Sequence, residues 1–135
     1  MYAVIDTNVI VASLKTRHHD SATSRVMEAV YSGGVTPLVN DKILTEYREV
    51  LSRPRLKLDS SKCEYIIALI SDLAERLYPA RYEYPMPDED DRIFYEIALA
   101  GQDIDETRLV TGNLKHFPRS TIVVTPSEFC ALLDI

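Results

Sequence analysis

Oxygen-bearing side chains recur where apolar segments of the chain end. Asp6 and Asn8 follow the apolar run 1–5, and Thr111 and Asn113 stand at the end of the run 107–111. A carboxylate that directly follows a buried segment is itself partly buried, so it needs a cation or several hydrogen-bond donors. The alternative interpretation is structural: both tripeptides, at 6–8 and 111–113, also suit turns, and the first suits a helix start.

Two further acidic positions fall on expected helices. Glu46 lies about 40° from Val50 on a helical wheel, at the border of an apolar arc that repeats with a helical period. The run Asp88–Asp91 opens another helix, where carboxylates complement the helix dipole. Four adjacent carboxylates also repel one another, and a bound cation would relieve that repulsion. The alternatives are an ordinary surface glutamate and simple helix capping.

The residue types at these positions favour one kind of chemistry. Carboxylates without a histidine or cysteine cluster suit Mg²⁺ or Mn²⁺ and not zinc, and such ions typically serve phosphoryl chemistry. The candidate metal ligands are Asp6, Glu46, Asp88 and Asp91. Thr111 and Asn113 would hold a water molecule or a phosphate oxygen, and Gly112 would let the backbone approach closely.

The elements that must position these residues alternate along the chain. Strands are expected at 1–5, 35–39, 107–111 and 121–124, with 78–84 as a further candidate. Helices are expected between them, capped by Asp20 or Ser21, by Asn40 or Asp41, by Ser61 with Glu64, by the acidic run, and by Thr125 with Glu128. Short apolar strands separated by helices predict parallel βαβ units with helices on both sheet faces, and ligands bind outside the carboxyl ends of such strands.

Composition narrows the class of protein. A chain of 135 residues with 46% hydrophobic residues is expected to form one domain, residues 1–135. No apolar run approaches the ~18 residues of a membrane span, and we expect neither a signal peptide nor a membrane location. Two cysteines make no disulfide framework, which favours a reduced, cytoplasmic setting.

The net charge of −6 argues against a protein that coats nucleic acid generally, because such proteins are usually basic. The charge is also distributed unevenly along the chain. Residues 1–58 hold 8 Lys and Arg against 6 Asp and Glu, and residues 59–135 hold 7 against 15. A basic strip beside an acidic cleft is one interpretation, and chance unevenness on a solvated surface is the other. The basic candidates for gripping a phosphate backbone are Lys15, Arg17, His18, Arg48, Arg53, Arg55 and Lys57.

Four motifs in order make the chain resemble the PIN-domain nucleases over nearly its whole length. They are the apolar run ending in Asp6-Thr7-Asn8-Val9, the helical Glu46 within 43–47, Asp91 within 91–98, and the segment 110–117. Within that family the chain is most similar to the VapC-like toxin components of prokaryotic toxin–antitoxin pairs.

The resemblance implies a three-layer α/β/α fold with a mostly parallel sheet of four or five strands, and metal-dependent cleavage of RNA. Asp6, Glu46 and Asp91 match the three principal acidic positions of the family, while Asn113 stands where many members carry a fourth acid. The implied mechanism has Asp6, Asp91 and Glu46 hold Mg²⁺ or Mn²⁺, with a water molecule oriented by Glu46 or Asp88 attacking phosphorus in line. The resemblance also suggests a homodimer.

An antitoxin protein is the partner that the resemblance implies. Tyr82 and Tyr84 are candidates for exposed contact residues, or equally for core residues.

Other functions fit the residues less well. A haloacid-dehalogenase-type phosphatase needs a second aspartate where this chain has Asn8, and a response-regulator receiver needs an acidic pair at the first strand. The main rival is a PIN scaffold with weak or lost catalysis that binds RNA or protein, which Asn113 and the acidic isoelectric point of about 5.0 motivate.

Overall fold

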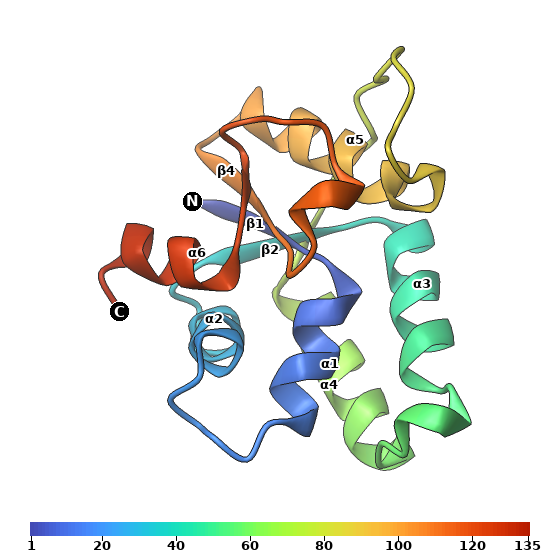
Figure 1. Ribbon diagram of the computed structural model, residues 1–135, viewed down its shortest axis with the longest axis vertical. Coiled ribbons are helices and arrows are strands. Elements are labelled where there is room, and N and C mark those ends of the chain that lie inside the picture. The colour runs from blue at the N-terminus through green and yellow to red at the C-terminus, as the bar shows by residue number, and fades with distance from the viewer.

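The computed structural model describes residues 1–135 and has a five-stranded, all-parallel sheet at its centre (Figure 1). Its strand order is β3-β2-β1-β4-β5. The strands are β1 (Tyr2–Ile5), β2 (Thr36–Val39), β3 (Glu75–Arg76), β4 (Thr107–Val110) and β5 (Val123–Val124). The predicted α/β fold with helices on both faces of a parallel sheet is therefore confirmed.

Six α-helices and three single-turn 3₁₀ helices connect the strands. The α-helices are α1 (Thr7–Lys15), α2 (Ala22–Tyr31), α3 (Asp41–Leu51), α4 (Ser60–Leu73), α5 (Arg92–Gln102) and α6 (Pro126–Leu133). The 3₁₀ turns are η1 (Pro54–Leu56), η2 (Glu89–Asp91) and η3 (Leu114–His116). None of the helices combines the length and the apolar character that crossing a membrane requires.

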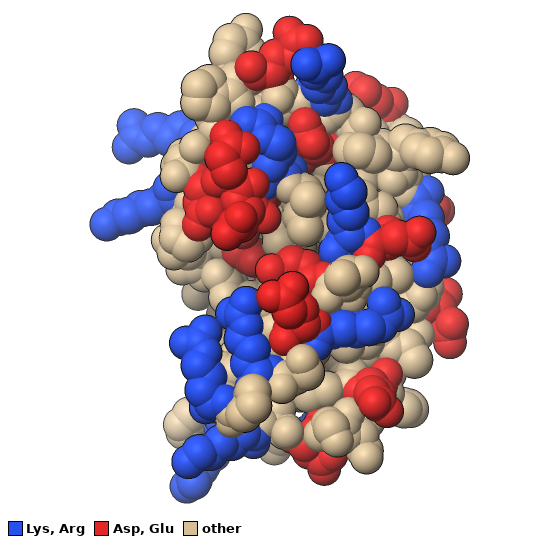
Figure 2. Space-filling model, turned by 90° about the vertical axis from the view of Figure 1, so that its right-hand side faces the viewer, with Lys and Arg blue, Asp and Glu red and all other residues tan.

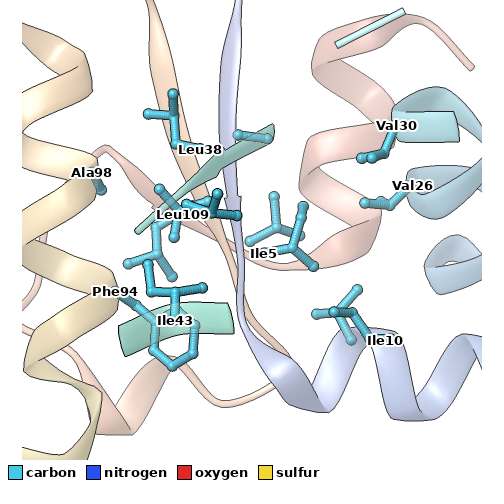
Figure 3. Close-up of a cluster of buried hydrophobic side chains, with 14 of the residues drawn as sticks. Ile5, Ile10, Val26, Val30, Leu38, Ile43, Phe94, Ala98 and Leu109 are labelled. Carbon is cyan, nitrogen blue, oxygen red and sulfur yellow. The ribbon is translucent and has the colours of Figure 1, made fainter. Parts of the chain in front are cut away.

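The core lies on both faces of the sheet, which gives the three layers (Figure 3). Phe94 and Ala98 of α5 pack beside Leu109 of β4 on one side of the strands. Val26 and Val30 of α2 lie on the other side. The strands are buried on both faces because helices cover both, which explains why they are continuous apolar runs without alternation.

Helix caps follow the expected chemistry at three of the predicted starts. Ser21 accepts from the Ser24 amide, Asn40 accepts from the Ile43 amide, and the Thr125–Glu128 capping box is complete. The predicted Ser61–Glu64 box is wrong. Asp59 caps α4 instead, since its carboxylate accepts from the amides of residues 61 and 62, and the helix begins at Ser60.

Several predicted elements differ from the structure. Residues 78–84 form no strand; the edge strand β3 is the shorter pair 75–76, next to β2. The acidic run does not begin the α-helix directly but forms η2 ahead of α5. Residues 6–8 could have formed a turn or a helix start, and the structure shows the helix start, because α1 begins at Thr7.

Gly101 is the second-last residue of α5, which ends at Gln102. A methyl group at this position would lie 2.5 Å from Leu38 Cδ1 and 2.8 Å from Thr107 Oγ1. The glycine therefore lets the end of α5 pack closely on the sheet.

Candidate active site

The sheet order reverses between β1 and β4, and that reversal positions the candidate site. From β1 the chain runs outward to β2 and β3, and it then returns to build β4 and β5 on the other side. Ligands bind at such a switch point, outside the carboxyl ends of the strands. Ile5 pairs with Val110 in parallel register. The residues that follow them, Asp6 and Thr111, are therefore neighbours at the carboxyl edge of the sheet.

Asp6 is a buried carboxylate, only 5% exposed. Thr111 Oγ1 donates to its Oδ2 at 2.7 Å. Burial raises the pKa of Asp6 above its ordinary value, the Thr111 hydrogen bond lowers it, and the charge of Glu46 raises it further. Glu46 therefore lies close enough to Asp6 for its charge to affect the pKa of Asp6, although the two residues are far apart in sequence.

Glu46 is half-buried on α3, as its place at the border of the apolar arc predicted. The hydroxyl of Thr7, the first residue of α1, donates to Glu46 Oε2 at 2.6 Å. The next residue, Tyr47, is buried and donates from its hydroxyl to the carbonyl of Ile5 at 2.6 Å. This bond fixes α3 to the end of β1 and so holds Glu46 beside Asp6.

Asp88 and Asp91 lie at the start and end of the η2 turn, close to His116 of η3. His116 Nδ1 is 3.0 Å from Asp91 Oδ2 and 3.5 Å from Asp88 Oδ2. The three side chains offer ligand atoms that all lie within 4.8 Å of one another. Burial raises the pKa of Asp91 to about 6, with further contributions from the charges of Asp6 and Asp88.

The structure thus brings all four predicted carboxylates to one edge, in two subsets. Asp6 and Glu46 form one subset, and Asp88 and Asp91 form the other with His116. Repulsion between Asp6 and Asp91 connects the subsets.

His116 was missed by the sequence analysis, although it stands inside the motif 110–117. The short spacing from Asn113 to His116 in the sequence was the available signal, because three residues span one helical turn.

The segment 111–113 is organised by internal hydrogen bonds. Thr111 is 0% exposed, and its hydroxyl oxygen also accepts from the Asn113 amide at 3.0 Å. The Asn113 side chain bonds to His116. Gly112 N donates to Asn8 Oδ1 at 3.1 Å, and a methyl group on Gly112 would meet Asn8 at an ordinary 3.5 Å. The expected close backbone approach at Gly112 is therefore not required by contacts within the chain.

The chemistry of this donor set fits a divalent cation. The ion pairs of the chain give Asp6 and Glu46 no lysine or arginine partner, and Asp88 and Asp91 pair only with His116. Carboxylates that lie close together without a cation raise the pKa of their neighbours: the charge of Glu46 raises the pKa of Asp6, and the charge of Asp6 raises the pKa of Asp91. A divalent ion held by oxygen ligands would remove that repulsion.

Basic side chains gather beside the acidic edge. Figure 2 shows the side of the molecule on which α3 lies, with Asp and Glu in the upper left and the centre, and with Lys and Arg at the lower left as well as around and between the acidic side chains. Lys15 at the end of α1 donates to the Leu56 carbonyl at 3.2 Å, which brings it beside Arg55 and Lys57. Arg53 forms an ion pair with Glu49, with Nη2 lying 3.6 Å from Oε1.

The two candidate contact tyrosines have different environments. Tyr82 is half-buried, with its ring edge-on to Tyr95 at 4.9 Å and the Arg92 guanidinium 5.8 Å from its centroid. Tyr84 is 69% exposed. Tyr84 is therefore the more accessible of the two to a partner.

A comparison of the sequence with known protein families identifies the class of protein that has this fold and this acidic site. The family model described as PIN domain matches residues 2–115, so the chain belongs to the PIN-domain family. PIN domains are generally nucleases that use divalent metal ions, which suggests a nucleic acid as substrate. No curated protein and no solved structure gives a significant match to this chain.

Proposed function

We propose that this chain is a divalent-cation-dependent ribonuclease that hydrolyses RNA phosphodiester bonds. One observation carries the proposal: Asp6, Glu46 and Asp91 come from three separate elements to the switch point of the sheet, and no lysine or arginine neutralises them. Burying like charges together is costly, and a cation-binding function accounts for it.

The chain's own residues have separable roles in this proposal. Asp6, Glu46 and Asp91 would hold Mg²⁺ or Mn²⁺, with Asp88 next to them. When bound, such an ion polarises the phosphate and activates water at neutral pH. Thr111 is fully buried, so its role is to hold Asp6 and not to touch substrate. Thr7 holds Glu46 in the same way.

Glu46 or Asp88 orients the attacking water and accepts its proton. Thr7 occupies only Oε2 of Glu46 and leaves Oε1 available. In-line attack by water on phosphorus, with the P–O3′ bond breaking and O3′ leaving to become a 3′-hydroxyl, would leave a 5′-phosphate on the other product. Attack by the 2′-hydroxyl of the RNA would instead break the P–O5′ bond and leave a 5′-hydroxyl. Lys15, Arg17, Arg48, Arg53 and Arg55 would hold the RNA backbone.

Cleavage of a labelled single-stranded RNA in Mn²⁺ and in EDTA tests the proposal. The purified chain is compared with Asp6→Asn, Asp91→Asn and the control Asp72→Asn, which changes an exposed carboxylate on α4. We expect cleavage in Mn²⁺ by the wild type and the control alone. Equal cleavage under every condition would reveal a contaminating nuclease and remove the proposal. RNA binding without any cleavage would favour the non-catalytic scaffold instead.

The toxin role is a finer proposal that rests on the resemblance of the four motifs to VapC-like proteins. Induced expression in a bacterial host is expected to arrest growth, and the Asp6→Asn variant is expected to relieve the arrest. A small DNA-binding protein encoded next to this chain would be the expected antitoxin. Normal growth with the active wild type present would contradict the toxin role and leave the ribonuclease proposal intact.

A further inference from the structure

His116 is bonded through both ring nitrogens, and each bond leads to a different part of the site. Nε2 is 2.8 Å from Asn113 Nδ2, and Nδ1 is 3.0 Å from Asp91 Oδ2. The η3 turn that separates Asn113 from His116 makes this possible, because it folds the two side chains onto the same side. Asn113 therefore reaches the carboxylate of Asp91 only through the imidazole.

The chemistry of the amide fixes the direction of these bonds. An amide NH₂ group can only donate, so Nε2 of His116 accepts from Asn113. Nδ1–H of the ring then donates to Asp91 Oδ2. This arrangement occupies one oxygen of Asp91, and Oδ1 has no hydrogen-bond partner within the chain.

We propose that Asn113 and His116 form a relay that orients Asp91 for cation binding, with Asn113 acting through the imidazole and not on the cation. The inference rests on the proposed function in one respect, namely that Asp91 is a cation ligand. His116 is then a positioning residue. Hydrogen-bond partners of this kind contribute about 10–100-fold to metal affinity or activity.

The relay also explains what an amide accomplishes at position 113. An amide NH₂ group can donate to Nε2 of His116, which an ionised carboxylate at the same position cannot do.

A double-mutant cycle on Mn²⁺ binding tests the relay. Isothermal titration with Mn²⁺ alone compares the wild type with Asn113→Ala, His116→Ala and the double variant. We expect His116→Ala to weaken binding by about 10–100-fold and Asn113→Ala by less. The double variant should bind as His116→Ala does, because Asn113 has no other route to Asp91. Losses that multiply in the double variant, or no loss in His116→Ala, would overturn the relay.

Two further variants separate positioning from folding and from general effects. His116→Gln retains an amide donor and is expected to recover part of the Mn²⁺ affinity. His19→Ala removes an exposed histidine outside the site and is expected to bind Mn²⁺ as the wild type does. Melting temperatures close to that of the wild type are expected for all variants, since His116 is half-exposed.

Pulsed electron paramagnetic resonance of bound Mn²⁺ distinguishes a positioning residue from a direct ligand. We expect no strong coupling to an imidazole nitrogen. A directly coordinated nitrogen that disappears in His116→Ala would overturn the relay in favour of a ligand role.

Failure of the relay and failure of the proposed function give different results. Wild-type protein that binds Mn²⁺ with the expected cycle but cleaves no RNA removes the ribonuclease and leaves the relay. Wild-type protein that cleaves RNA in Mn²⁺ but loses no Mn²⁺ affinity in His116→Ala removes the relay and leaves the ribonuclease, whereas wild-type protein that binds no Mn²⁺ removes both.

Discussion

The two subsets of the candidate site are built in different ways. Asp6 is 5% exposed and is fixed by the register of β1 and β4 and by the buried hydroxyl of Thr111. Asp88 and Asp91 stand on a 3₁₀ turn, with side chains 37% and 15% exposed, and are contacted by the half-exposed ring of His116. One subset belongs to the core, and the other belongs to the surface.

This difference shows where rigidity and adaptability lie in the site. The buried subset is held by strands and helices that the whole sheet supports, so its geometry cannot change without changing the core. The surface subset depends on local turns, and small changes there shift orientation without unfolding the chain. Substitutions in the two subsets should therefore differ in both the size and the kind of their effects.

The largest expected contrast is between Asp6→Asn and Asp88→Asn. Loss of the buried charge should reduce RNA cleavage by about 10³-fold, which corresponds to about 4 kcal/mol of transition-state stabilisation. Loss of Asp88, which is more exposed, should cost about tenfold or less. Single-turnover rates in Mn²⁺ measure both. Equal losses in the two variants would show that the subsets do not differ in function.

The same buried charge should oppose folding. Because burial raises the pKa of Asp6, its ionised form destabilises the folded chain at neutral pH. Asp6→Asn is accordingly expected to raise the melting temperature in EDTA while it reduces cleavage by about 10³-fold.

A smaller effect is expected from Thr111→Val, which keeps the side-chain shape and removes the bond to Asp6. We expect cleavage to fall by about 10–100-fold. Thr107→Val is a matched control, since Thr107 is equally buried at the other end of β4 and bonds to the Asp105 carbonyl. Both variants should lose about 1–3 kcal/mol of stability, but only Thr111→Val should lose activity. A comparable loss of activity in the control would attribute the effect to folding.

The surface subset should give the folded chain a pH dependence. Folding raises the pKa of Asp91 from its ordinary 3.8 to about 6. Between these values the folded chain binds more protons than the unfolded chain, so the free energy of unfolding falls as the pH rises. After discounting for solvent screening, we expect a loss of roughly 1–2 kcal/mol.

Urea denaturation in EDTA between pH 4.5 and 6.5 measures this loss. The Asp91→Asn variant should show a flatter profile than the wild type, and Mn²⁺ should restore stability at the upper end. A wild-type profile that matches Asp91→Asn would contradict the raised pKa.

Much of the fold could be predicted because apolar runs and caps are local signals. The runs at 1–5, 35–39 and 107–111 became the three central strands with small changes in length. The missed elements lack such signals. Strand β3 is two exposed residues that pair with β2 by position and not by pattern.

The site was predictable to the extent that sheet topology determines it. Once β1 and β4 are neighbours in parallel register, Asp6 and Thr111 must meet at the carboxyl edge. The position of His116 depends instead on the η3 turn, which returns the ring toward Asp91. A single 3₁₀ turn has no periodicity to detect, and this explains why the histidine was overlooked.

The smallest effect is expected outside both subsets, in the basic residues. The two acidic subsets repel phosphate, so the RNA backbone should be held by positive side chains nearby, and Figure 2 shows Lys and Arg close to the acidic side chains on this face. The double variant Lys15→Ala, Arg55→Ala should raise KM a few-fold and leave kcat unchanged. The slope of log affinity against log salt should become shallower by roughly 0.7 for each lost contact with single-stranded RNA.

Arg25→Ala is the control for this variant. Arg25 is an exposed cation on α2 and lies near Gly34. Gly34 precedes β2, so Arg25 lies at the amino end of the strands, away from the carboxyl edge that holds the candidate site. Its salt slope and KM should match those of the wild type. A fall in kcat in the double variant would instead connect the basic residues with the geometry of the carboxylates. Equal slopes in all three proteins would assign phosphate binding to other residues, with Arg48 and Lys115 the next to test.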